Sequence, residues 1–129
     1  KGKGAWRNGE SISVSSVTAC ENALIATGFP YEIASRVDEI LERMRPVLSS
    51  CQGVRRCGAA ALDLAWTACG RFDAFYEDEL KPWDMAAGAL LVTEAGGSIS
   101  NLDGSPFDLR WSILAGNKAM HELIGKMIR

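Results

Sequence analysis

The sequence lacks a hydrophobic run long enough to cross a membrane, and it lacks an excess of either charge. Its longest apolar run, from Met85 to Val92, has 8 residues, whereas a membrane-spanning helix needs about 20. The 14 basic and 16 acidic residues leave a net charge of −2, which argues against general electrostatic binding to nucleic acid. The first ten residues contain no apolar segment typical of a secretory signal. We therefore expect neither a membrane nor a nucleic acid as a direct partner.

The signatures of several enzyme classes are also missing. The chain contains no GxSxG, GxxxxGK[ST] or HExxH motif, which argues against serine hydrolases, P-loop NTPases and zinc proteases of these types. Its only histidine, His121, has no nucleophile paired with it in the sequence, so we interpret it as a structural residue. No two of the four cysteines are separated by two residues, which argues against a zinc knuckle or a thioredoxin-type pair. We expect reduced thiols and a cytoplasmic protein.

The sequence does contain short apolar segments that alternate with helical patterns. The length of 129 residues and the hydrophobic content of 47% are typical of one globular domain. Asn8-Gly9 predicts a hairpin turn, Asn117 predicts a helix cap, and Pro46 predicts a kinked or shortened last helical turn. The expected strands are 12–15, 23–27, 54–57, 72–76, 98–101 and 112–115, and the expected helices are 30–48, 59–69, 82–95 and 118–128. This alternation predicts an α/β fold, a mixed β-sheet flanked by helices.

Two carboxylates lie close to the start of the helix expected at Pro82. Asp84 falls in the first helical turn, where a carboxylate complements the helix dipole or ligates a hard cation such as Mg²⁺. Glu77 follows the strand predicted over 72–76 and precedes Asp84 by seven residues. Because α/β sheets bind ligands at the carboxyl ends of their strands, both carboxylates can open onto one crevice.

Two further features flank this pair of carboxylates. Gly58, Ala59 and Ala60 begin another helix, whose free N–H groups can meet an oxygen-rich ligand. A glycine before a helix is also ordinary punctuation of the chain. Asp78 and Glu79 we interpret as part of a solvated charged turn.

Taken together, these residues resemble the inositol monophosphatase family, in its bacterial and plant branch. The run from Trp83 to Gly97 fits the C-terminal signature of that family at every constrained position. Four other segments support the resemblance. Residues 8–9 are similar to the family's hairpin, and residues 26–31 to the same region of its bacterial and plant branch. Residues 56–61 are similar to its sugar-binding loop, and residues 104–108 to its late turn. The resemblance covers essentially the whole chain.

The resemblance implies Mg²⁺-dependent hydrolysis of inositol monophosphate or a similar polyol phosphate by a lithium-sensitive, cytoplasmic homodimer. It also leaves open related substrates such as fructose bisphosphate, a nucleotide phosphate or histidinol phosphate. It assigns Asp84 to the metal. It assigns to the substrate, or to the neighbourhood of its pocket, the positions Glu77, Gly58, Ala59, Ala60, Thr27 and Gly28.

One part of the family pattern is missing from this sequence. Family members carry a second signature, Asp-Pro-hydrophobic-Asp-Gly-Thr/Ser, and an upstream Glu-Glu pair, and neither occurs here. Those groups supply most metal ligands and activate the attacking water. The resemblance therefore implies that residues 1–129 form the C-terminal α/β domain, with no complete catalytic set and no activity without the missing N-terminal half. The alternative is a non-catalytic interaction module associated with transcription or ribosome-maturation machinery, as in some bacterial relatives.

Overall fold

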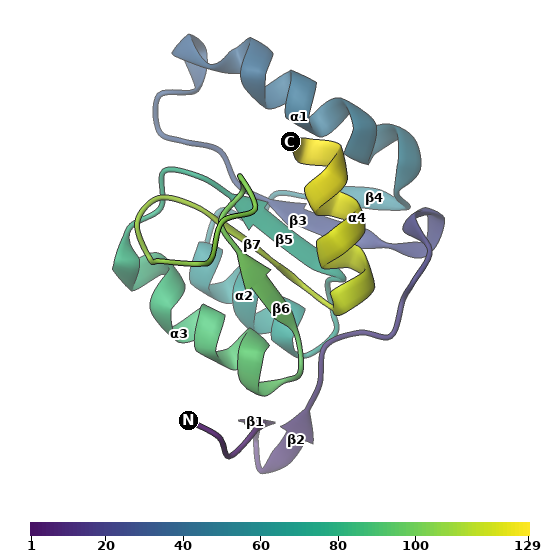
Figure 1. The fold of residues 1–129 in the computed structure, drawn as a ribbon, viewed down its shortest axis with the longest axis vertical. Helices are drawn as coiled ribbons and strands as arrows, with labels where there is room; N and C mark the ends of the chain where they lie inside the picture. The colour runs from purple at the N-terminus through teal and green to yellow at the C-terminus, as the bar shows by residue number, and fades with distance from the viewer.

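The computed structural model describes all residues from 1 to 129. Figure 1 shows a central sheet covered by helices on both faces, with a small separate hairpin near the N-terminus. The strands are β1 (Ala5–Arg7), β2 (Glu10–Ile12), β3 (Leu24–Thr27), β4 (Gly53–Arg55), β5 (Ala74–Glu77), β6 (Ser98–Ser100) and β7 (Ile113–Gly116). The helices are α1 (Val37–Ser50), α2 (Ala60–Ala68), α3 (Pro82–Glu94) and α4 (Lys118–Ile128), with 3-10 turns at Cys20–Asn22 and Ile33–Ser35. The predicted α/β architecture is confirmed.

The central sheet is mixed, with the strand order β4-β3-β5-β7-β6. Strand β3 pairs in parallel with both β4 and β5, whereas β7 runs antiparallel to β5 and β6. The carboxyl ends of β3, β4 and β5 therefore meet at one edge of the sheet. Strand β7 begins at this same edge, because its first residue, Ile113, lies opposite Glu77 at the end of β5. Loops from four parts of the chain converge there.

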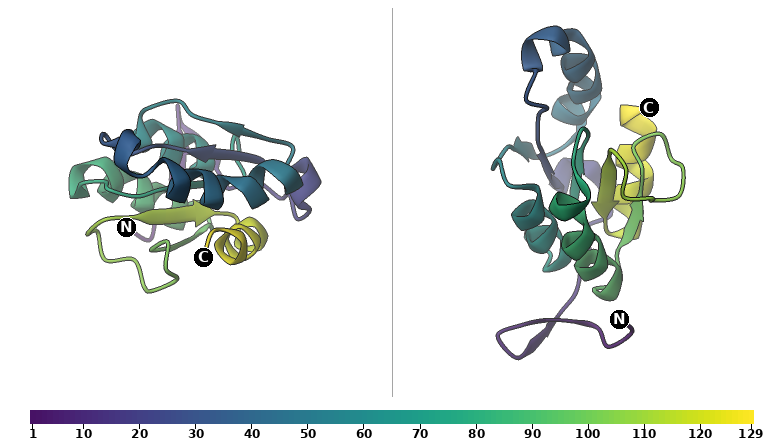
Figure 2. Two further views of the ribbon diagram at one scale, coloured as in Figure 1. Left: turned by 90° about the horizontal axis from the view of Figure 1, so that it is seen from above. Right: turned by 90° about the vertical axis from the view of Figure 1, so that its left-hand side faces the viewer.

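The two faces of the sheet carry separate hydrophobic layers, because successive strand residues point to opposite sides. In β5, Phe75 packs into the layer that contains α2 and α3. Its neighbours Ala74 and Tyr76 pack into the layer that contains α1 and α4. Figure 2 shows the β1–β2 hairpin projecting from one end of this layered body, with α1 toward the other end. No helix is both long and apolar enough to cross a membrane.

The structure confirms the predicted hairpin turn and the predicted cap of the last helix. Asn8 and Gly9 both adopt positive φ angles, 52° and 84°, as the tight turn of the β1–β2 hairpin requires. The side chain of Asn117 accepts a hydrogen bond of 2.9 Å from the Met120 N–H and so caps α4.

The expectations for the segments 12–15 and 30–48 differ most from the observed elements. The strand expected over 12–15 ends at Ile12. In the rest of that segment, the Val14 N–H donates a hydrogen bond to the Ala95 carbonyl instead of to a neighbouring strand. The helix expected from residue 30 begins at Val37, after a 3-10 turn. Of the kinked or shortened last turn predicted at Pro46, the shortening is wrong, because the helix continues to Ser50. The fully buried side chain of Val47 holds that last turn against the core.

Candidate functional site

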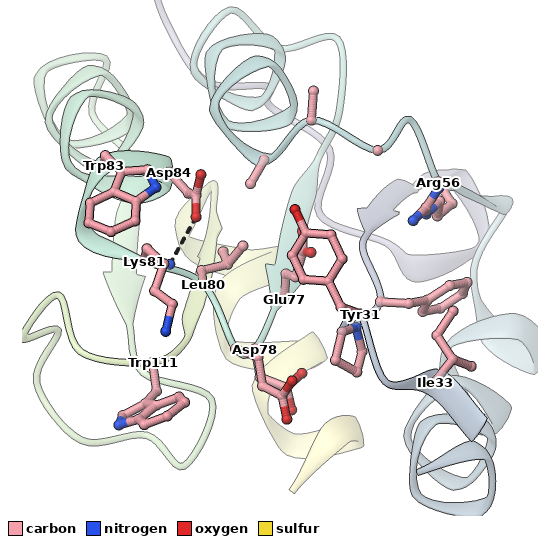
Figure 3. Close-up of a pocket in the computed structure, with 16 residues that line it drawn as sticks. Tyr31, Ile33, Arg56, Glu77, Asp78, Leu80, Lys81, Trp83, Asp84 and Trp111 are labelled. Carbon is pink, nitrogen blue, oxygen red and sulfur yellow. Dashed lines mark hydrogen bonds between the residues drawn. The ribbon is translucent and has the colours of Figure 1, made fainter. Parts of the chain in front are cut away.

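A pocket of about 660 Å³ opens at the edge of the sheet where the four loops converge. Its walls come from segments 29–33, 56–60 and 77–84 and from Trp111, as Figure 3 shows. The pocket brings together five of the residues that the sequence singled out: Gly58, Ala59, Ala60, Glu77 and Asp84. These residues are up to 26 positions apart in the sequence. They lie close together in space because β3 pairs in parallel with both β4 and β5.

Glu77 is the last residue of β5, one residue beyond the strand end expected from sequence. Its carboxyl group packs directly against Gly28, where a Cβ atom would overlap it. Burial raises the pKa of Glu77 to about 7, with a contribution from the nearby Asp63 carboxyl, while Arg56 opposes the shift. Near neutral pH the carboxyl of Glu77 can therefore both accept and donate hydrogen bonds, which suits the hydroxyl groups of a polyol.

Asp84 lies in the first turn of α3, two residues after Pro82, which begins the helix. Its Oδ2 atom accepts a hydrogen bond of 2.9 Å from the Lys81 N–H, while the Asp84 N–H donates to the Lys81 carbonyl. The reciprocal bonds fix the side chain at the rim of the pocket, at the end of α3 where a carboxylate complements the helix dipole. No hydrogen bond is made by the second carboxylate oxygen, Oδ1, which is left for a ligand.

The chain by itself does not form a metal site. No group of three or more histidine, cysteine or acidic side chains is arranged to hold an ion. Mg²⁺ requires near-octahedral coordination by hard oxygen ligands. Asp84 fits such an ion as one ligand.

The turn before α2 forms a second wall of the pocket. Gly58 has a φ angle of +83°, a left-handed conformation that favours glycine. It leads into Ala59, the N-cap residue of α2, which makes no side-chain capping bond. The Leu62 N–H donates to the Ala59 carbonyl, so the amides of Ala60 and Ala61 are the ones left at the start of α2 for a bound oxygen-rich ligand.

Thr27 and Gly28 do not line the main pocket. The Thr27 side chain is 1% exposed, and its hydroxyl donates a hydrogen bond of 2.9 Å to the Tyr76 carbonyl, which ties β3 to β5. Gly28 affects the pocket indirectly, because its lack of a side chain makes room for the Glu77 carboxyl. The structure thus places both residues behind the pocket wall.

The interpretation as a solvated charged turn holds for Glu79, which is exposed, but is wrong for Asp78, whose side chain is mostly buried and paired with two arginines. Arg36 lies 2.8 Å from Asp78 and 2.7 Å from Glu79, and Arg43 lies 2.9 Å from Asp78. Burial alone would raise the pKa of Asp78, but hydrogen bonds from the two arginines hold it below its usual value. The seven-residue spacing of the arginines, two helical turns, was the signal that they share one face.

Two other residues near the pocket, Lys81 and Asp63, were missed by the sequence analysis, and Arg56 was noted only as part of the segment 56–61. The Arg56 guanidinium lies 5.7 Å from the centre of the Phe29 ring, and the Lys81 ammonium lies 5.4 Å from that of Trp111. Asp63 is fully buried, and neither of its carboxyl oxygens has a hydrogen-bond partner. Nothing in its apolar surroundings in the sequence marks Asp63 as part of the site.

The sequence of this chain is similar to curated proteins with two kinds of name. It is 48% identical over 120 residues to the Nus factor SuhB of Pseudomonas aeruginosa, covering 91% of this chain and 44% of that protein. It is 42% identical over 132 residues to an inositol-1-monophosphatase of Caulobacter vibrioides, covering 100% of this chain and 52% of that protein. The chain spans about half the length of these curated relatives.

Solved structures agree with the sequence comparison. The extragenic suppressor protein suhB from Bartonella henselae superposes with a TM-score of 0.94 at 40% identity, over 99% of this chain and 50% of that one. An inositol monophosphatase from Anabaena gives a TM-score of 0.91 at 38% identity, over 98% of this chain and 50% of that one. The inositol monophosphatase family matches residues 1–129. This chain therefore belongs to the inositol monophosphatase family.

Proposed function

We propose that this chain is the substrate-binding part of a phosphatase that hydrolyses inositol monophosphate or a similar polyol phosphate with Mg²⁺. The observation that carries the proposal is the pocket that gathers the 58–60 turn, Glu77 and Asp84. The resemblance assigns these positions to sugar and metal binding. Membership of the family and the relatives named inositol-1-monophosphatase support a hydrolase.

Each of these groups has a distinct role in the proposal. Glu77 exchanges hydrogen bonds with substrate hydroxyls, as its pKa of about 7 allows. The amides at the start of α2 donate hydrogen bonds to hydroxyl oxygens of the substrate. Asp84 supplies one oxygen ligand to the cation and is held in place by the Lys81 N–H.

Three proposals about the whole protein accompany this one. The remaining metal ligands and the group that activates water lie in an N-terminal half outside these residues. The complete enzyme is a homodimer in the cytoplasm. Residues 1–129 constitute the C-terminal domain of that enzyme and are inactive alone. The coverage of about half of each relative supports the division into two parts.

A second candidate function is a non-catalytic module in transcription or ribosome maturation. It is supported by relatives that are named Nus factor SuhB, one of them 48% identical to this chain. This function needs no intact pocket. It therefore predicts that substitutions at Glu77 and Asp84 leave the biological role unchanged.

The decisive experiment measures phosphate release from inositol 1-phosphate, with and without Mg²⁺. We expect no release by the 129-residue chain and Mg²⁺-dependent release when the N-terminal half is joined to it. In the joined protein, Asp84→Asn should abolish most of this release, whereas Asp38→Asn on the exposed side of α1 should not. Activity of the chain alone, or full activity of Asp84→Asn, would refute the assignment.

A further inference from the structure

Lys81 is an unpaired cation held at the rim of the pocket. It lies between Glu77 and Asp84 on the same loop, yet its ammonium group forms no salt bridge and no hydrogen bond with the protein. Instead the ammonium group lies 5.4 Å from the centre of the Trp111 ring. In Figure 3 the Lys81 side chain extends toward Trp111, on the side of the pocket opposite Arg56.

The acidic neighbours of Lys81 are occupied elsewhere. Asp78 and Glu79 line the same pocket, but the arginines of the α1 region bind both of them from outside it. Asp84 is directed by the backbone N–H of Lys81 and not by its ammonium group. The positive charge of Lys81 therefore remains available to an anion from solution.

The position of Lys81 is fixed on both sides. The preceding N–H, of Leu80, donates a hydrogen bond of 3.0 Å to the Trp111 carbonyl, and the Lys81 N–H donates one of 2.9 Å to Asp84. The Trp111 ring then supports the side chain, although the ring itself is 62% exposed. A cation that is already oriented loses less conformational entropy when it binds a ligand.

We propose that Lys81, supported by Trp111, forms a subsite for a second phosphate group on a polyol phosphate substrate. The inference rests on the proposed function, since the first phosphate is the one to be hydrolysed near Asp84. The pocket of about 660 Å³ is in the upper half of the usual range of about 300–1,000 Å³ for ligand pockets, and so has room for a polyol bisphosphate. An ammonium group binds a phosphate as a compact point charge.

The test compares a monophosphate with a bisphosphate on the same ring, in the complete enzyme. The substrates are inositol 1-phosphate and inositol 1,4-bisphosphate, and the readout is the ratio of kcat/KM for the bisphosphate to that for the monophosphate. Lys81→Gln should lower this ratio about tenfold, which corresponds to roughly 1.4 kcal/mol. Lys118→Gln, at the start of α4, is the matched control and should leave both values unchanged.

Substitution of Trp111 provides a second test of the subsite. Trp111→Leu keeps Lys81 but removes its aromatic support, so the ratio should fall by a smaller factor. The double variant should show no greater loss than Lys81→Gln alone, because both changes disable one subsite. A ratio unchanged by Lys81→Gln, or fully additive losses, would overturn the inference.

Failure of the proposed function is distinguishable from failure of the subsite. If neither substrate is hydrolysed, the phosphatase assignment fails. The subsite is then judged from the Kd of inositol 1,4-bisphosphate, measured by calorimetry. A Kd about tenfold weaker in Lys81→Gln than in the Lys118→Gln control would support it, and equal values would overturn it.

Discussion

Replacing Glu77 by glutamine should change how the stability of the protein depends on pH. Burial raises the pKa of Glu77 from 4.5 to about 7 in the folded protein. Between these values the folded state keeps a proton that the unfolded state releases, so stability falls as pH rises through this window. The displacement corresponds to as much as about 3 kcal/mol, at roughly 1.36 kcal/mol per pH unit. Glutamine carries no charge, so Glu77→Gln removes this loss.

The assay is urea unfolding followed by circular dichroism, at several values between about pH 4.5 and pH 8. The difference in unfolding free energy between Glu77→Gln and the original protein should move in favour of the variant by up to about 3 kcal/mol across this range. The control is Glu10→Gln, on the exposed hairpin strand β2, for which no such change is expected. A difference that stays constant from pH 4.5 to pH 8 would show that the Glu77 carboxyl is not held in a desolvated place.

Three further substitutions test the packing around the site and the sheet. Gly28→Ala should displace the Glu77 carboxyl and raise KM for inositol 1-phosphate in the complete enzyme about threefold or more, whereas Gly53→Ala, with 3.5 Å to its nearest neighbour, should not. Gly88→Ala places a methyl group against a buried side chain of α2 and should lower stability by about 1–3 kcal/mol, seen as a lower Tm. Asn117→Ala removes the cap of α4 and the hydrogen bonds that the side-chain amide donates to Ser15 and Val17, and should cost about 1–2 kcal/mol in urea unfolding; a cost near zero would contradict these roles.

Features of the fold that depend on local chemistry were predictable from the sequence. The Asn8-Gly9 turn needs two positive φ angles, and these residue types supply them at little cost. The late start of α1 was not predictable from periodicity, since Ile33 continues the apolar spacing of the helix yet lies in a 3-10 turn. The antiparallel direction of β7 depends on pairing with β5, about 40 residues earlier, and no local pattern encodes it.

The site shows the same division between local and distant causes. The proximity of Glu77 and Asp84 to one pocket followed from their place after a strand and before a helix. The partners of Asp78 and Glu79 lie 35 to 43 residues away, so the acidic loop looked solvated in the sequence. The interior position of Thr27 depends on the close pairing of β3 with β5. The sequence thus identified single site residues by their type and position, whereas their interaction partners could be identified only from the folded structure.

The convergence of four loops at one sheet edge has a consequence for the order of events during synthesis. The last wall of the pocket, with Trp111, is placed by the pairing of β7 with β5, and β7 ends only at Gly116. A nascent chain that has emerged as far as α3 already contains Glu77 and Asp84 but lacks the strand that anchors this wall. Such long-range pairing forms late because a large loop must close first. A growing chain therefore completes this pocket only after β7, which ends at Gly116, is available to pair with β5.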